Sequence, residues 1–236
     1  WPLLSQRTGA EVWVKHENHT PIGAFKVRGG LVYLDALKRQ GPTKRVVAAT
    51  RGNHGQSIAF AAARAGLNSA VVVPRGNAVG KNAAMQALGA ELIEHGADFQ
   101  EALEHAMTLA DGERATFIPS FDIGLVKGVA SYALEFFYAA PDLHTIYVPV
   151  GLGSGICGTI AAREALGLKT EIVGVVSENA AAYALSFEAG KVISTNSSNS
   201  IADGLDCRVP NADAFGIIRA GVERIVTVSD NEILSA

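Results

Sequence analysis

The sequence predicts an α/β fold in which mostly parallel sheets are covered by helices on both faces. From residue 45 onward, short apolar runs rich in β-branched residues alternate with segments whose apolar residues recur at helical spacing. Such alternation is typical of parallel strands joined by crossover helices. A length of 236 residues with 48% hydrophobic residues suffices for a substantial core, in one large domain or in two smaller lobes.

The individual elements follow from the same two periodicities. The apolar runs predict strands at residues 11–15, 45–50, 69–74, 90–94, 115–119, 144–150, 171–176 and 224–228. The helical spacing predicts a first helix that begins near Lys26. It predicts further helices at residues 54–65, 81–88, 99–110, 125–138, 155–166 and about 213–220. The Gly/Ser/Asn-rich residues 194–200 predict a surface loop, and no internal repeat is present.

Composition narrows the function classes. The net charge is −3 with acidic and basic residues interspersed, so neither nucleic acid nor an anionic membrane surface is expected as a partner. No apolar run reaches the roughly 18 residues needed to span a bilayer. Cys157 and Cys207 form no metal-ligand pattern and indicate a reduced, cytoplasmic setting. The chain starts without methionine, and its last residues have the pattern of a helix start, so we interpret both ends as cut. Whether a targeting peptide has been removed is left open.

Lys26 is the first candidate functional residue. It follows a Pro-Ile-Gly turn, and the apolar residues behind it recur at helical spacing: Val27, Leu31, Leu34 and Leu37. This places the lysine in the first turn of a helix, whose positive end lowers the pKa of the ammonium group. A lysine with a lowered pKa is a nucleophile that forms a Schiff base with an aldehyde. The alternative interpretation is an ordinary solvated lysine.

A second candidate is the stretch 50–55, which reads Thr-Arg-Gly-Asn-His-Gly and lies where a strand gives way to a helix. The free backbone N–H groups of a helix N-terminus attract anions, and a carboxylate is a natural guest. The alternative is a simple helix-starting turn capped by Asn53.

A third candidate is the glycine-rich stretch 148–158, Val-Pro-Val-Gly-Leu-Gly-Ser-Gly-Ile-Cys-Gly. Glycines let the backbone approach a phosphate closely, and the helix that follows contributes its positive end. The spacing Gly153-x-Gly155-x-x-Gly158 also satisfies the dinucleotide fingerprint, and Glu171 lies near its usual acidic position. A nicotinamide cofactor therefore competes with a simpler phosphate group, although that fingerprint usually occupies the first β-α turn of a domain.

The region around Lys26 resembles the lysine motif of the fold-type II pyridoxal-phosphate enzymes, in particular the threonine/serine dehydratase and serine racemase group. The matching residues are Glu17, Asn18, Pro21, Gly23, Ala24, Phe25, Lys26, Arg28 and Gly29. The resemblance implies pyridoxal 5'-phosphate as the cofactor. It also implies that Lys26 joins the cofactor aldehyde and that Phe25 lies near the cofactor ring.

The other candidate stretches resemble further motifs of this group, in the same order along the chain. By resemblance, the stretch 50–55, here called the Asn-His loop, binds the substrate carboxylate through Thr50, Gly52 and His54. Asn53 of the same loop would bond the 3-hydroxyl of the cofactor ring. The glycine stretch resembles a tetraglycine phosphate loop, which implies phosphate contacts for Gly151, Leu152, Gly153, Ser154 and Gly155.

Two more features follow from the resemblance. The segment Ile201-Ala202-Asp203-Gly204-Leu205 resembles one that places the carbonyl of Gly204 beside the ring. Some members hold a divalent cation through an acidic pair, but Val176 and Ala182 occupy those positions here, so no metal is expected.

Arg51 departs from the pattern of the group. Many dehydratases have Ser or Ala at this position, and in the racemising members a serine there acts from the face opposite the lysine. Because arginine does not deprotonate in proteins, little racemase activity is expected. We interpret Arg51 as a substrate-binding residue for a second carboxylate, as in 3-hydroxyaspartate.

The resemblance also implies an architecture: two lobes in three α/β/α layers with mostly parallel sheets, like the β subunit of tryptophan synthase. Residues 45–128 would form a small lobe inserted into a larger one, made of residues 1–44 and 129–236. Members of the group are longer, and a late segment supplies the partner of the pyridine nitrogen. On that basis the chain is expected to be incomplete at its C-terminus.

The implied reaction is β-elimination on a small hydroxy amino acid, L-threonine or L-serine, to give a 2-oxo acid and ammonia. One alternative is a 3-hydroxyaspartate dehydratase. Another is a β-replacing enzyme like the cysteine synthases, against which His54 argues. A nicotinamide-nucleotide-binding α/β module is the alternative without pyridoxal chemistry. By resemblance, a homodimer or homotetramer is expected.

Overall fold

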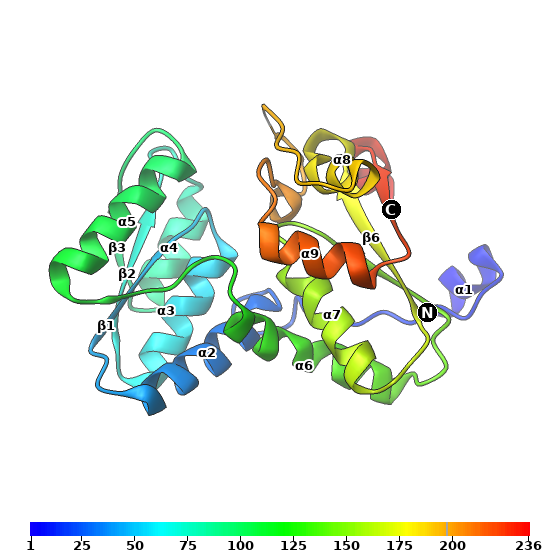
Figure 1. Ribbon diagram of the computed structural model, residues 1–236, viewed down its shortest axis with the longest axis horizontal. Coiled ribbons are helices and arrows are strands. Elements are labelled where there is room, and N and C mark those ends of the chain that lie inside the picture. Colours follow the sequence, from blue (N-terminus) through cyan, green and yellow to red (C-terminus); the bar gives the residue numbers. More distant parts are fainter. Residues whose placement is uncertain (197) are drawn as a thin grey trace.

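The computed structural model describes residues 1–196 and 198–236, and its strands form two parallel sheets (Figure 1). The first sheet has the order β3-β2-β1-β4, with β1 at Arg45–Ala49, β2 at Asn68–Val73, β3 at Glu91–Glu94 and β4 at Thr116–Phe117. The second has the order β5-β6-β7, at Thr145–Pro149, Glu171–Ser177 and Arg224–Val228. All of these pairings are parallel, which confirms the predicted α/β class.

Helices cover both faces of the first sheet. Successive residues of a strand point to opposite sides, so alternate residues of β1 pack against different helices. Val46 and Ala48 of β1 pack against α3 (Asn53–Ala65), which with α4 (Val79–Ala87) covers one face. Val47 and Ala49 pack instead against α5 (Phe99–Glu113). The alanines of α5 that face the sheet let this helix approach closely: Ala102, Ala106 and Ala110.

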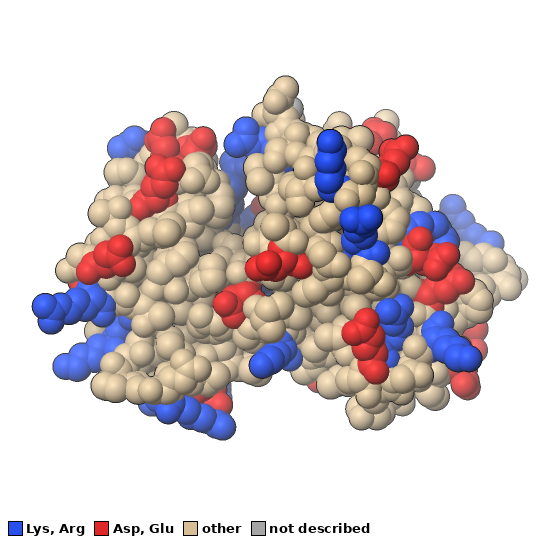
Figure 2. Space-filling view, in the orientation of Figure 1, with Lys and Arg blue, Asp and Glu red and all other residues tan. Residues whose placement is uncertain are grey.

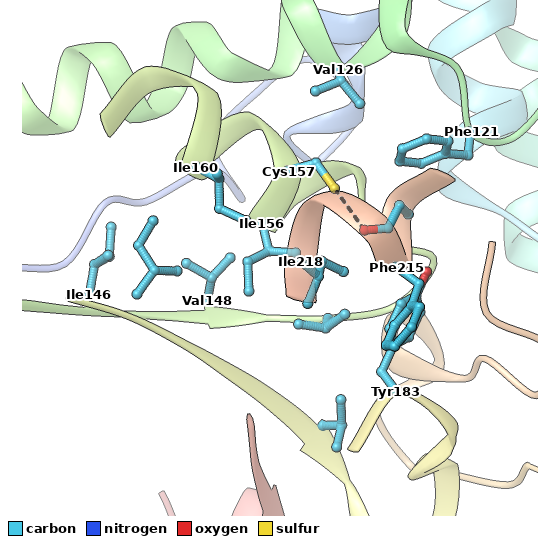
Figure 3. Packing of buried hydrophobic residues seen from close by; sticks show 14 of the residues in the cluster. Phe121, Val126, Ile146, Val148, Ile156, Cys157, Ile160, Tyr183, Phe215 and Ile218 are labelled. Carbon is cyan, nitrogen blue, oxygen red and sulfur yellow. Dashed lines mark hydrogen bonds between the residues drawn. The ribbon is translucent and has the colours of Figure 1, made fainter. Parts of the chain in front are cut away.

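The second sheet packs against α7 (Ser154–Ala165), α8 (Ala182–Ala189) and α9 (Ala212–Gly221) through one large apolar cluster. Figure 3 shows this cluster, in which the aliphatic side chains of β5 face those of α7. The thiol of Cys157 donates to the carbonyl of Ala214 at 3.7 Å and ties α7 to α9. Cys157 and Cys207 are both buried and unpaired.

Helices α2 (Lys26–Gln40) and α6 (Ile123–Ala139) run between the two sheets (Figure 1). They cross where each has glycine: a Cβ on Gly128 would overlap the carbonyl of Arg28 and lie 2.8 Å from the Cα of Gly29. A Cβ on Gly30 would likewise lie 2.8 Å from the carbonyl oxygen of Ser57 in α3. The small residues therefore fix the position of α2, whose first residue is Lys26.

Arg28 holds the segment that leads into α2. Its guanidinium bonds Glu17 at 2.8 Å and Glu135 of α6 at 2.7 Å, and Lys15 also reaches Glu135 at 2.7 Å. These contacts raise the pKa of Arg28 and lower that of Glu135 to about 2, chiefly through the hydrogen bond from Arg28. The network gives a structural role to the glutamate and the arginine of the lysine motif.

The structure departs from the predicted elements at the N-terminus. The predicted strand 11–15 is wrong: this segment pairs with no strand, and Trp13 and Val14 are exposed. An apolar run becomes a strand only when a neighbouring strand takes its backbone groups. Helices α1 (Pro2–Thr8) and α8 were not predicted, and α10 (Asp230–Ser235) fits the expected helix start.

The remaining elements agree with prediction to within a few residues at their ends. In the predicted loop 194–200 the described residues have no regular structure, and residue 197 lies outside them. The lobe boundaries at residues 45 and 128 remain a proposal, which the division into two sheets supports. Among the described residues, no helix is both long and apolar enough to cross a membrane.

Candidate active site

The candidate site is built around Lys26, at the junction between the two sheet-bearing halves. Its Nζ donates to the hydroxyl of Ser154, the first residue of α7, at 3.2 Å. Its carbonyl accepts from the hydroxyl of Ser57 in α3 at 2.6 Å. The backbone of Lys26 is therefore held by the half that carries the first sheet, and its ammonium group contacts the half that carries the second. Figure 2 shows the surface hollowed between these halves, with basic side chains along the hollow.

Enclosure by protein atoms lowers the pKa of Lys26 to about 8, from an ordinary value of 10.5. No carboxylate pairs with this ammonium group in the described part of the chain, so nothing offsets the loss of hydration. At neutral pH roughly a tenth of such a lysine is uncharged, against well under a thousandth for an ordinary one. A lysine with such a lowered pKa is suited to act as a nucleophile.

We expect the capture of an aldehyde by Lys26 to depend on pH in a defined direction. The uncharged amine is the reactive form, so the rate should rise as the pH increases through about 8 and level off above it. Stopped-flow absorbance after mixing the apoprotein with pyridoxal phosphate at pH 6–10 measures it. A rate that keeps rising tenfold per unit up to pH 10 would show an ordinary lysine.

The glycine stretch forms a turn of free N–H groups at the start of α7. Within the described residues, the N–H groups of residues 151–156 donate to no protein acceptor. Gly153 has φ +103°, and a Cβ on Gly151 would overlap the carbonyl oxygen of Gly204. Leu152 has no positive φ, because Arg114 is the single non-glycine residue with one in the described chain. The leucine in place of a glycine is thus accommodated without strain.

The Asn-His loop forms a second turn of this kind at the start of α3. The cap residue is Gly52, so the alternative in which Asn53 caps the helix is wrong. The hydroxyl of Thr50 accepts from the N–H of Gly52 at 2.9 Å and shapes the turn. The N–H groups of residues 53–55 have no acceptor within the described chain, and the Asn53 side chain is exposed.

His54 contributes to this turn through its backbone. Its ring is buried and lies 3.3 Å from the carbonyl oxygen of Ile118 through Nε2. Burial and then the charge of Lys26 lower the pKa of His54 to about 3, so the ring is neutral at physiological pH. Because Nε2 of the ring is engaged with Ile118, the backbone N–H of His54 is the donor of this residue that has no acceptor within the described chain.

Two ion pairs, which the sequence did not reveal, cross between the halves beside this turn. Arg51 lies 3.7 Å from Asp206, and Lys81 of α4 pairs with Asp203. Lys81 lies along the turn, since a Cβ on Gly52 would meet its Cδ at 2.8 Å. One oxygen of Asp206, Oδ1, is buried with no hydrogen-bond partner. Charged residues in segments far apart in the sequence carry no sequence signal for such pairing.

Phe25 and Gly204 both lie against the glycine stretch. The ring centroid of Phe25 lies 5.7 Å from that of Tyr132. A Cβ on Gly155 would lie 3.2 Å from Cζ of Phe25. The carbonyl of Gly204 points at Gly151. The structure thus brings together the residues predicted from three stretches, while their contacts with a cofactor remain predictions.

The donor set fits an aldehyde that carries a phosphate. A lysine with a lowered pKa supplies the nitrogen for the aldehyde, and the free N–H groups of residues 151–156 supply donors for an anion. A second set of free N–H groups at residues 53–55 suits a carboxylate. No group of three or more potential metal ligands gathers in the described residues.

Comparison with known proteins agrees with this chemistry. The whole chain, residues 1–236, matches the family described as pyridoxal-phosphate dependent enzyme. It is 32% identical over 231 residues to the catabolic L-threonine dehydratase TdcB of Escherichia coli, covering 98% of this chain and 70% of that protein. It is also 32% identical to the biosynthetic L-threonine dehydratase IlvA of Pasteurella multocida, of which it spans 46%.

Solved structures show the same fold. The processed threonine deaminase isoform 2 of Solanum lycopersicum superimposes with a TM-score of 0.94 at 29% identity, over 100% of this chain and 65% of that one. Maize serine racemase gives a TM-score of 0.95 at 27% identity, over 100% and 71%. The chain thus spans between about half and three quarters of the proteins it matches. It belongs to the family of pyridoxal-phosphate dependent enzymes, of fold type II.

Proposed function

We propose that the protein is a dehydratase, or ammonia-lyase, that converts L-threonine or L-serine to a 2-oxo acid and ammonia. The observation that carries the proposal is the position of Lys26, with its lowered pKa, between two turns of free N–H groups. The dehydratase activity named for the E. coli and P. multocida relatives supports the choice of reaction.

The residues of the chain divide the work by their position. The N–H groups of residues 151–155 and the hydroxyl of Ser154 would hold the phosphate, with the positive end of α7 behind them. Pyridoxal phosphate, when bound, supplies the conjugated ring that delocalises negative charge from the substrate Cα. Lys26 removes the proton from that carbon at its uncharged Nζ.

Substrate orientation falls to the turn at the start of α3. The free N–H groups of residues 53–55 attract the substrate carboxylate, and the neutral His54 adds no competing charge. Asn53 would bond the ring hydroxyl, since its exposed side chain has no partner among the described residues. Thr50 keeps the turn in shape through Gly52.

The direct test is to measure 2-oxo acid and ammonia released from a panel of amino acids by the purified protein with pyridoxal phosphate. Equal amounts of the two products from L-threonine or L-serine are expected. If O-acetylserine and sulfide gave cysteine while the hydroxy amino acids gave nothing, β-replacement would be the reaction. Binding of a nicotinamide nucleotide without a pyridoxal absorbance band would reject the whole assignment.

A second candidate substrate is 3-hydroxyaspartate, and the placement of Arg51 favours it. The Arg51 side chain is 65% exposed beside the turn at residues 50–55, and Asp206, its one acidic partner among the described residues, lies 3.7 Å away. Lys81 also lies against Gly52, but its charge is paired with Asp203, so Arg51 is the more loosely paired of the two cations. The second carboxylate of such a substrate could therefore pair with Arg51, whose guanidinium makes only a long ion pair with Asp206.

We expect Arg51→Ala to lower kcat/KM for 3-hydroxyaspartate about 10- to 100-fold, the usual range for a hydrogen bond to a charged group. The value for threonine should change by less than about threefold, since threonine has no second carboxylate. Arg75→Ala, at an exposed arginine in another loop of the same half, serves as the control. Equal losses with both substrates would remove this candidate and leave the dehydratase proposal in place.

We also propose a homodimer or homotetramer in a reduced cytoplasm. Exposed apolar side chains near the N-terminus support self-association: Trp1, Leu3, Trp13 and Val14. The two unpaired cysteines support the reduced setting.

A further inference from the structure

Tyr183 of α8 lies behind the glycine stretch and is almost completely buried. Its hydroxyl donates to the carbonyl oxygen of Leu152 at 2.9 Å and accepts from the backbone N–H of Asn211 at 3.2 Å. Asn211 is the residue that caps α9, through its side chain on the N–H of Ala214. One hydroxyl therefore joins the glycine stretch to two helices.

The glycine stretch is tightly packed on the side that faces α8 and α9. A Cβ on Gly153 would lie 3.0 Å from the Cβ of Ala214 and 3.2 Å from both the Tyr183 hydroxyl and Ile218. Figure 3 shows Tyr183 beside Phe215 at the edge of the apolar cluster, with Ile218 next in the same cluster. The tyrosine ring is held by this packing, so its hydroxyl is a fixed hydrogen-bond donor.

The geometry of the peptide unit determines where the N–H group next to this carbonyl points. The carbonyl of Leu152 and the N–H of Gly153 belong to one planar trans peptide, in which the two groups point in opposite directions. Because Tyr183 holds the carbonyl toward the protein interior, the N–H of Gly153 must point away from it. That N–H is one of the donors without a protein acceptor among the described residues.

We propose that Tyr183 is a positioning residue for phosphate: it orients the peptide between Leu152 and Gly153 so that the N–H of Gly153 faces the anion. A phenylalanine would keep the packing but leave this peptide free to rotate, with the Leu152 carbonyl unsatisfied. The effect should be confined to the phosphate, because among the described residues the hydrogen bonds of Tyr183 go to Leu152 and Asn211 and not to Lys26 or the turn at α3. The inference rests on the cofactor class and is independent of which amino acid is the substrate.

The test compares two ligands that share the aldehyde and the ring but differ in the phosphate. The affinities of the protein for pyridoxal 5'-phosphate and for pyridoxal are measured by absorbance titration, in the wild type and in Tyr183→Phe. The variant should bind the phosphorylated ligand about 3- to 10-fold more weakly, the usual range for one lost hydrogen bond, and bind pyridoxal unchanged. Ile172→Val, which trims a buried side chain of the same cluster, should leave the ratio of the two affinities at its wild-type value.

Two results would overturn the proposal. If Tyr183→Phe weakened both ligands equally, the tyrosine would act through general stability, and if it weakened neither, the hydroxyl would have no role. Should the variant fail to fold, the wild-type apoprotein decides: inorganic phosphate should shift the amide proton resonance of Gly153 downfield. A Gly153 resonance that stays in place while phosphate binds would reject the proposal. None of these measurements depends on turnover.

Discussion

Lys26→Ala should lack the absorbance band of the lysine Schiff base and should form 2-oxo acid from threonine at least about 10²- to 10⁴-fold more slowly. That range is the usual contribution of one group positioned for proton transfer. The expected loss is this large because, among the described residues, Lys26 is the one amine that donates to the hydroxyl of Ser154. Lys26 reaches this hydroxyl from the start of a helix whose position is fixed by close glycine contacts. Absorbance spectra and product assays of the purified variant measure both effects.

Lys44→Ala is a suitable control, since Lys44 is an exposed lysine just before β1 and has no part in the site. Its spectrum and rate should match those of the wild type. Reduction of the holoprotein with borohydride, followed by peptide mapping, should place the pyridoxyl group on Lys26. A label on any other amine, or a normal band in Lys26→Ala, would contradict the assignment of the nucleophile.

The features that depend on local pattern were predictable from the sequence. Lys26 was expected in the first turn of a helix and is the first residue of α2, because the apolar residues behind it repeat at helical spacing. The strands of both sheets follow from short β-branched runs between helices, and all pair in parallel. Both N–H turns were found for the same reason: each lies where a strand gives way to a helix.

The features that depend on contacts distant in sequence were not predictable. The segment 11–15 has the composition of a strand but finds no neighbouring strand. Tyr183 lies in an Ala-rich helix that no periodicity marks, and its bond to Leu152 exists because α8 packs behind the glycine stretch. The pairing of Arg51 with Asp206 likewise arises where two loops of different halves meet. Only the folded chain brings such groups together.

Gly128→Ala should lower the free energy of unfolding by about 3 kcal/mol, the upper part of the range for overpacking. The added Cβ would overlap the carbonyl oxygen of Arg28 and lie 2.8 Å from the Cα of Gly29. Both are backbone atoms of α2, so no side-chain rotation can relieve the clash and the two helices must separate. Urea denaturation followed by circular dichroism measures the loss.

Gly112→Ala is the matched control, because Gly112 lies in helix α5 and a Cβ there would meet nothing within 4 Å. That variant should gain up to about 1 kcal/mol, since alanine favours the helix over glycine. Separation of α2 from α6 would also move Lys26, so Gly128→Ala should bind pyridoxal phosphate more weakly even under conditions where it remains folded. Equal stability of the two variants would mean that the crossing of α2 and α6 tolerates a wider spacing, and that the position of Lys26 is set by Ser57 and Arg28 instead.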